Sequence, residues 1–168
     1  MAVKTIDELF IHELSDIYSA EKQLTKALPR LARASTNPAL RAAFEAHLEE
    51  TQGQIDRIDQ IVEKGNLRLK RIKCAAMEGL VEEGKEVIES IEAGPVRDAA
   101  LIGGAQKVEH YEIASYGTLA AMAKQLGMDD ALSLLLETLN EEKSTDEKLT
   151  LLAEQGGNEE AARKRKAA

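Results

Sequence analysis

The sequence predicts an all-α fold with four long helices and a long crossover that carries a short fifth helix. The first observation is composition: 11 glycines and three prolines among 168 residues leave long segments rich in Ala, Leu, Glu, Lys and Gln, which favour helix. The second is periodicity, because apolar residues recur three or four positions apart in each long segment. The third is that no segment alternates for long as a half-buried strand would. A chain of this length suits one domain with a real core.

The first long helix is expected to begin after Thr5 and to run to about Ala34. Thr5 and Glu8 have the spacing of a capping box, in which the threonine caps the helix and the glutamate reaches back to it. Pro29 lies inside the apolar pattern and predicts a kink or a local opening. Glu21 falls within the apolar stripe, a position where a carboxylate would lose its hydration.

The second long helix follows a break in the pattern. Asn37 suits its N-cap and Pro38 its first turn, and the helix should end near the Gly-Asn pair at residues 65–66. His47 flanks the apolar face of this helix, and Glu50 lies towards the side of that face. Of the residues in buried phase, Glu50 is therefore the one whose position fits the core least well.

Residues 67–93 form a long connection with an amphipathic stretch of its own. The stretch predicts one short helix between about residues 74 and 92, closed by a Gly-Pro pair at residues 94–95. Cys74 is the one cysteine of the chain, so no intrachain disulfide exists. We interpret it as a small, buried or half-buried apolar residue.

The third long helix is expected from about Pro95 to Leu126, and it carries a pair of acidic residues on its apolar face. At about 100° per residue, Glu109 and Glu112 both point within roughly 40° of the centre of the apolar stripe. Two carboxylates one turn apart repel each other unless a positive charge lies between them. The glycines at residues 103–104 lower helix propensity by about 1 kcal/mol each, and close packing against a neighbour is the simplest explanation for them.

A turn at residues 127–129 leads into the fourth long helix. Glu142 and Asp146 take core positions in its apolar pattern. We expect a single domain over residues 1–157 and a disordered basic tail over residues 158–168.

The net charge of the chain limits the classes of partner that it can bind. A formal net charge of -8, from 30 acidic and 22 basic residues, argues against nucleic acid and anionic membranes. The N-terminus lacks the apolar core of a signal peptide, and no apolar run approaches the length of a membrane span. We therefore expect a cytoplasmic protein.

Every long helix carries an ionisable residue near the middle of its buried face. Antiparallel packing of such helices can bring their middles together, and six carboxylates and one imidazole would then share one site. Unpaired anions there would be prohibitive, whereas two divalent metal ions would balance them. Oxygen-rich ligands favour iron, or else manganese, over a structural zinc. The predicted metal ligands are Glu21, His47, Glu50, Glu109, Glu112, Glu142 and Asp146.

A set of buried polar networks with lysine and arginine partners is the alternative. This alternative explains one buried acid easily. It does not readily explain buried acids on all four long helices, because the basic residues that would pair with them fall mainly on the outer faces. His47 is either a ligand, a hydrogen-bond partner of a ligand, or a core histidine with its own partners. His110 lies off the buried centre and is expected at the surface or against the crossover.

Four sequence blocks together resemble a known family. Residues 16–24, 47–51, 106–117 and 141–146 resemble the ferritin-like superfamily and, within it, the bacterial YciE/YciF stress-protein family. The resemblance implies a ferritin-like four-helix bundle with a metal site, a homodimeric assembly and a link to stress responses.

The superfamily pattern transfers to some positions and not to others. Its single acid on the first helix matches Glu21, its Glu-x-x-Glu on the third matches residues 109–112, and its acid on the fourth matches Glu142. The usual Glu-x-x-His of the second helix is absent, because the histidine precedes the acid as His47-x-x-Glu50. The usual histidine of the fourth helix is replaced by an aspartate. Poorer nitrogen ligation puts catalytic competence in doubt more than metal binding.

Three functions remain open at this point. The first is ferroxidase or peroxide-consuming chemistry, in which O2 or peroxide oxidises two bound iron ions. The second is a non-catalytic, metal-stabilised dimeric bundle that binds a stress-related protein partner. The third is a helical interaction protein without metal, in which the acids pair with bases. The spacing of the acids favours the first two over the third.

Overall fold

The computed structural model describes residues 3–164, and the predicted all-α fold is confirmed over them. These residues form helices and connections and contain no strand. In chain order the elements are α1 (Ile6–Ala34), α2 (Pro38–Lys64), α3 (Ala75–Ser90), α4 (Pro95–Gln125), α5 (Asp129–Leu152), the π-helical turn η1 (Ala153–Gly157) and α6 (Asn158–Lys164). None of the helices in this range combines the length and the apolar character needed to cross a bilayer.

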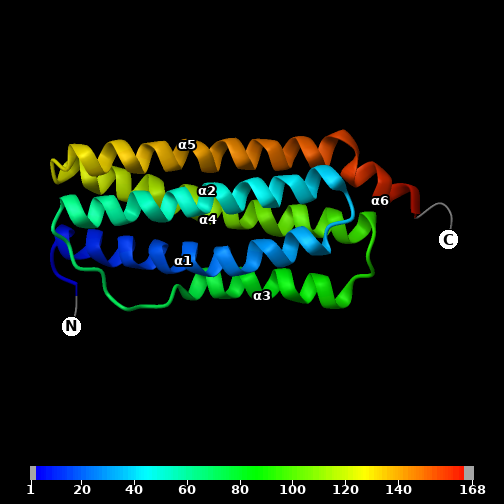
Figure 1. The fold of residues 1–168 in the computed structure, drawn as a ribbon, viewed down its shortest axis with the longest axis horizontal. Helices are drawn as coiled ribbons and strands as arrows, with labels where there is room; N and C mark the ends of the chain where they lie inside the picture. The colour runs from blue at the N-terminus through cyan, green and yellow to red at the C-terminus, as the bar shows by residue number, and fades with distance from the viewer. Residues whose placement is uncertain (1–2, 165–168) are drawn as a thin grey trace.

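The four long helices lie side by side along the length of the molecule (Figure 1). The main packing partners are α1 with α2, α4 with α5, α2 with α5 and α1 with α4, so the four helices surround a common core. Short connections make α1–α2 and α4–α5 antiparallel pairs, as helix pairs with short loops are. The long crossover then carries the chain back along the outside, and α3 lies over α1 and α4.

A row of polar side chains on α1 holds the extended part of the crossover. Ser15 Oγ accepts from Lys70 N at 2.9 Å, and Ser19 Oγ accepts from Cys74 N at 2.9 Å. Gln23 Nε2 donates to the carbonyl of Cys74 at 3.0 Å. These residues recur every four positions and supply the partners that non-helical backbone needs when it packs on a helix. Cys74 is buried, as expected.

Asp98, near the start of α4, links this helix to the turn between α1 and α2. Its buried carboxylate accepts from Thr36 N at 2.9 Å and from Asn37 N at 2.8 Å, and it also accepts from the Thr36 hydroxyl. The α1–α2 turn is thereby tied to the first turn of α4. Asn37 caps α2 as predicted, because its Oδ1 accepts from Ala39 N at 2.8 Å.

Two local expectations differ from the structure. Thr5 caps α1, but Glu8 accepts from the backbone N–H of Lys4 at 2.7 Å instead of reaching back to Thr5. The helix continues past Pro29 and runs to Ala34, as predicted. Residues 158–164, expected to be disordered, form α6, while the rest of that tail lies outside the described residues.

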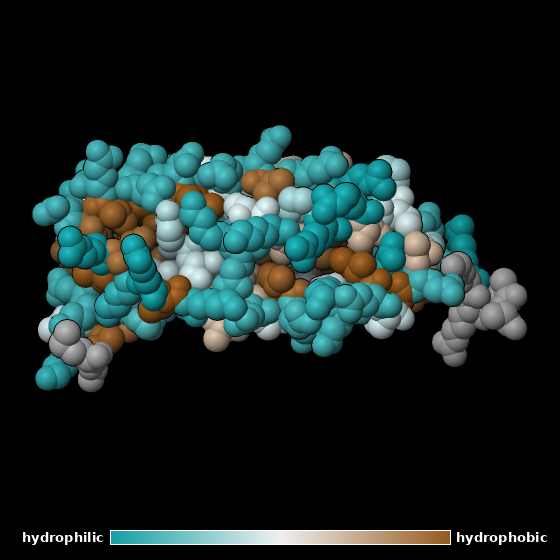
Figure 2. All heavy atoms as spheres, turned by 60° about the horizontal axis from the view of Figure 1, so that its bottom comes forward, coloured by the Kyte–Doolittle hydropathy of each residue, from teal (hydrophilic) through white to brown (hydrophobic). Residues whose placement is uncertain are grey.

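Close packing does not explain the glycine pair of α4. No heavy atom lies within 4 Å of a Cβ built on Gly103 or Gly104, so the expectation of a close neighbour is wrong within the described chain. Both glycines line a cavity of about 310 Å³ between α1, α3 and α4. The face that carries α3 is otherwise mostly hydrophilic, with hydrophobic residues showing between the polar ones (Figure 2).

Candidate metal centre

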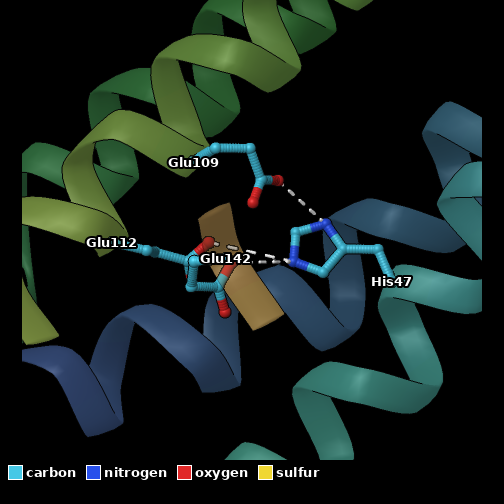
Figure 3. A group of neighbouring side chains, drawn as sticks. All are labelled: His47, Glu109, Glu112 and Glu142. Carbon is cyan, nitrogen blue, oxygen red and sulfur yellow. Dashed lines mark ion pairs between the residues drawn. The ribbon is translucent and has the colours of Figure 1, made fainter. Parts of the chain in front are cut away.

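Four ionisable side chains from three helices meet in the core between the long helices (Figure 3). His47 comes from α2, Glu109 and Glu112 come from successive turns of α4, and Glu142 comes from α5. One ligand atom from each lies within 4.8 Å of all the others. Their exposed fractions are 3%, 1%, 0% and 0%, so water does not solvate these groups from outside.

The imidazole ring of His47 lies between the carboxylates. Its Nδ1 is 3.1 Å from Glu109 Oε1, while its Nε2 is 3.9 Å from Glu112 Oε2 and 3.7 Å from Glu142 Oε2. Both ring nitrogens therefore face acidic oxygens. The sequence pattern placed His47 beside the apolar face of α2, and the structure buries it together with Phe44 and Thr51.

Glu21 extends the cluster towards α1. It is fully buried, and its Oε1 accepts a hydrogen bond from the Tyr116 hydroxyl of α4. The other oxygen, Oε2, has no hydrogen-bond partner. Tyr116 thus orients one oxygen of Glu21 and leaves the second available to a cation.

The protonation states of the cluster follow from burial. Desolvation raises the pKa of Glu109 to about 11 and that of Glu142 to about 7. It also raises the pKa of Glu21 and Glu112 well above the usual carboxyl range, and the charge of Glu142 raises both further. Burial, together with the nearby Lys148 ammonium, lowers the pKa of His47 to about 4. In the absence of a cation, the cluster at neutral pH holds a neutral imidazole among largely protonated carboxyl groups.

The donor set fits a divalent metal ion. Both oxygens of Glu109 and Glu112, one oxygen each of Glu21 and Glu142, and His47 Nε2 are buried without a hydrogen-bond partner. Each such group costs about 1–3 kcal/mol when it is left unsatisfied. A cation would satisfy several of them at once, and a neutral imidazole offers it a lone pair. Carboxylate oxygens with one imidazole suit iron or manganese.

Two predicted ligands lie outside this buried cluster. Glu50 is 29% exposed; its Oε2 accepts from the Thr145 hydroxyl at 3.0 Å, and its Oε1 is 3.6 Å from Lys148 Nζ. Asp146 is 22% exposed and lies 3.2 Å from His110 Nε2, which is at the surface as expected. Helical phase explains the position of Glu50, because three residues after His47 the side chain is turned by about 60° towards the edge.

Gln54 contributes to the site, although no role was predicted for it from the sequence. The residue is fully buried on α2, and its Nε2 donates to Glu142 Oε1 and, at 3.2 Å, to Glu141 Oε2. Arg57 in turn donates to both oxygens of Glu141, at 2.5 and 2.8 Å. Glu142 is therefore held through one oxygen. The signal was the seven-residue spacing from His47, which places Gln54 two turns along the same face.

The chain is similar to proteins of known structure along nearly its whole length. It is 66% identical to the protein YciF of Escherichia coli (strain K12) over 165 residues, which are 98% of this chain and 99% of that protein. The crystal structure of the E. coli stress protein YciF superposes with a TM-score of 0.90 at 67% identity, covering 93% of this chain and 99% of that one.

Two further structures share the fold. YcfI from Rhodopseudomonas palustris has a TM-score of 0.85 at 46% identity, covering 88% of this chain and 94% of that one. A protein from Xanthomonas campestris pv. campestris has a TM-score of 0.75 and covers 96% of this chain and 99% of that one. Its 22% identity supports a common fold alone.

These similarities agree with the resemblance of the four sequence blocks to the YciE/YciF family. That resemblance pointed towards YciE within the YciE/YciF group, whereas the relative found is YciF. The sequence family described as "Domain of unknown function (DUF892)" matches residues 5–162, which include all the core helices and every residue of the cluster. The chain therefore belongs to the DUF892 family.

Proposed function

We propose that this chain is a ferritin-like four-helix bundle whose core binds two divalent metal ions. Iron is the preferred metal and manganese is the alternative. The bundle forms a homodimeric stress protein. The observation that carries the proposal is the buried group of His47, Glu109, Glu112 and Glu142, with its unpaired oxygens. Four buried side chains of this kind are costly in a structural core. A metal ion turns the same groups into ligands.

The ligands of the two ions would be His47, Glu109, Glu112 and Glu142, joined by Glu21 of α1, the one long helix that contributes none of these four. Two iron ions bound there would supply oxidation chemistry with O2 or peroxide. The chain's own part is to hold the donors in place, to exclude water and to release protons from its carboxyl groups as the ions bind. Glu50 and Asp146 contact Lys148 and His110 instead, so the proposal does not require them as ligands.

A second function is favoured by a specific observation. The cluster contains one imidazole, and nitrogen-poor ligation is compatible with metal binding without turnover. In this case the metal stabilises the fold, and the dimer binds a stress-related protein partner in the cytoplasm. The E. coli relative is described as a stress protein, a description that fits either function.

Metal analysis after anaerobic reconstitution tests the proposal. The wild type is compared with Glu109→Ala plus Glu112→Ala, and with a control that removes two exposed acids of the same spacing on α3, Glu86→Ala plus Glu89→Ala. About two iron or manganese ions per chain are expected in the wild type and in the control. The core variant should stay folded, because it loses buried acids, and should lose the metal. A wild type that binds no metal contradicts the proposal.

Oxygen consumption separates the two functions. If the chain is a ferroxidase, the iron-loaded protein consumes O2 and gains ferric absorption, and the core variant does neither. If the metal is structural, loading raises the melting temperature while O2 consumption stays at the level of free Fe(II).

A further inference from the structure

The proposed metal site is closed to solvent. None of its four residues is more than 3% exposed, so a hydrated ion cannot reach them without a path through the surrounding helices. The structure offers a place where that path would begin.

A small cavity adjoins the cluster between α2, α4 and α5. Its volume is about 30 Å³, more than the roughly 10–15 Å³ that a cavity needs to hold one water molecule. His47 belongs to its wall, and the short side chains of Ala46 and Ala105 leave its space open. Glu50 and Lys148 complete the wall. His47 is buried, whereas the Glu50 and Lys148 side chains are 29% and 55% exposed, so the cavity is lined by the imidazole-bearing residue and by two side chains that reach the surface.

Two of the side chains that line this cavity form an ion pair. Glu50 Oε1 lies 3.6 Å from Lys148 Nζ, and the buried Thr145 hydroxyl holds Glu50 Oε2 at 3.0 Å. Partly exposed pairs of this kind contribute about 0–1 kcal/mol and are screened by salt. The pair can therefore open at little cost, while Thr145 keeps the carboxylate in place.

Lys148 also bears on the end of the cavity at His47. The two residues line the same small cavity, so the positive charge of Lys148 lies beside the path to the imidazole. A cation that approaches His47 through this cavity is repelled as long as Lys148 stays in position. Glu50, by contrast, presents an anionic oxygen to an arriving cation.

We propose that Glu50 and Lys148 form a gate through which divalent metal ions reach the buried cluster. The arriving ion displaces the Lys148 ammonium from Glu50, the lysine turns into solvent, and the ion passes to His47. The inference rests on the proposed metal site. It gives Glu50 a role in the rate of binding and leaves ligation to the buried residues.

Anaerobic stopped-flow binding of Co²⁺, followed by its ligand-field absorption, tests the gate. Glu50→Gln is compared with Glu49→Gln, which neutralises the exposed neighbouring acid. Lys148→Ala is compared with Lys143→Ala, which removes an exposed lysine from the same helix. We expect Glu50→Gln to slow association about tenfold or more, in the range of electrostatic steering, with the wild-type number of ions at saturation. Lys148→Ala should speed association and reduce its salt dependence.

Three results would overturn the gate in distinguishable ways. An association rate for Glu50→Gln equal to that of Glu49→Gln removes the role of Glu50 in transit. Fewer ions bound at saturation in Glu50→Gln makes Glu50 a ligand instead. Both results leave the metal site standing. If wild-type protein binds no Co²⁺, the proposed site fails and the gate fails with it.

Discussion

At the residue scale, His47 is the side chain around which the site is arranged. Its ring faces three carboxylates at 3.1 to 3.9 Å, yet burial keeps its pKa low. A protonated imidazole would be a partner for the acids, whereas a neutral one is a ligand. The low pKa therefore favours metal binding over a simple ion-pair network.

Glu142 should give the metal-free protein a characteristic dependence on pH. Its pKa is raised from 4.5 to about 7 in the fold, so the folded state binds more protons than the unfolded state over that interval. Its contribution to the free energy of unfolding is then lost as pH rises through about 7. Glu142→Gln cannot ionise, and it should gain stability relative to the wild type between pH 5 and pH 8.

Urea unfolding in the presence of a chelator measures this difference. The pH dependence contributed by His47 has the opposite sign, because its folded pKa is lowered, but it is present in both proteins and largely cancels. Equal changes in the free energy of unfolding for the two proteins from pH 5 to pH 8 would show that Glu142 does not titrate as described.

Gln54 should set the affinity of the site without being a ligand. Its amide holds one oxygen of Glu142, and partners that orient metal ligands are worth about 10–100-fold in affinity. We expect Gln54→Ala to weaken Co²⁺ binding by about that factor, with the number of ions unchanged. Gln60→Ala, on an exposed position of α2, is the control. Equal affinities of the two variants in a competition titration would refute the role.

At the element scale, periodicity determined most of what could be predicted. The apolar stripes gave the four long helices nearly to their observed ends, and the phase of Glu109 and Glu112 placed both in the core. Contacts across helices were harder, because they depend on how each helix is rotated against its neighbour. The link from Gln54 to Glu142 and the pairing of Asp146 with His110 are of this kind. The partner of Glu8 was also hard to predict, because the backbone N–H groups of Lys4 and Thr5 are neighbours and the carboxylate accepts from Lys4.

The glycine pair of α4 provides a test of helix energetics. A methyl group on Gly104 meets no atom within 4 Å, and the residue lines the cavity between α1, α3 and α4. Gly104→Ala should therefore raise the free energy of unfolding by about 0.5–1 kcal/mol, through helix propensity and a smaller unfolded-state entropy. Gly117→Ala, which also has open space, is a comparison within α4 away from the cavity. A destabilised Gly104→Ala protein would indicate that something else occupies this space.

At the scale of the whole molecule, the order of the helices brings the site together. The crossover sends the chain back along the outside, so that α4 can lie against α1 while α5 lies against α2. Glu21, His47, the α4 acids and Glu142 then reach one core from four sides. The sequence predicted this convergence from the position of each residue near mid-helix. Homodimer formation stays a prediction, because it depends on a second chain.

Anomalous scattering from crystals loaded anaerobically with Mn²⁺ or Fe²⁺ tests the central claim most directly. The account expects anomalous peaks in the core, within about 2.0–2.3 Å of oxygens of the glutamate cluster and of a nitrogen of His47. Peaks at surface carboxylates alone, with none among His47, Glu109, Glu112 and Glu142, would contradict it.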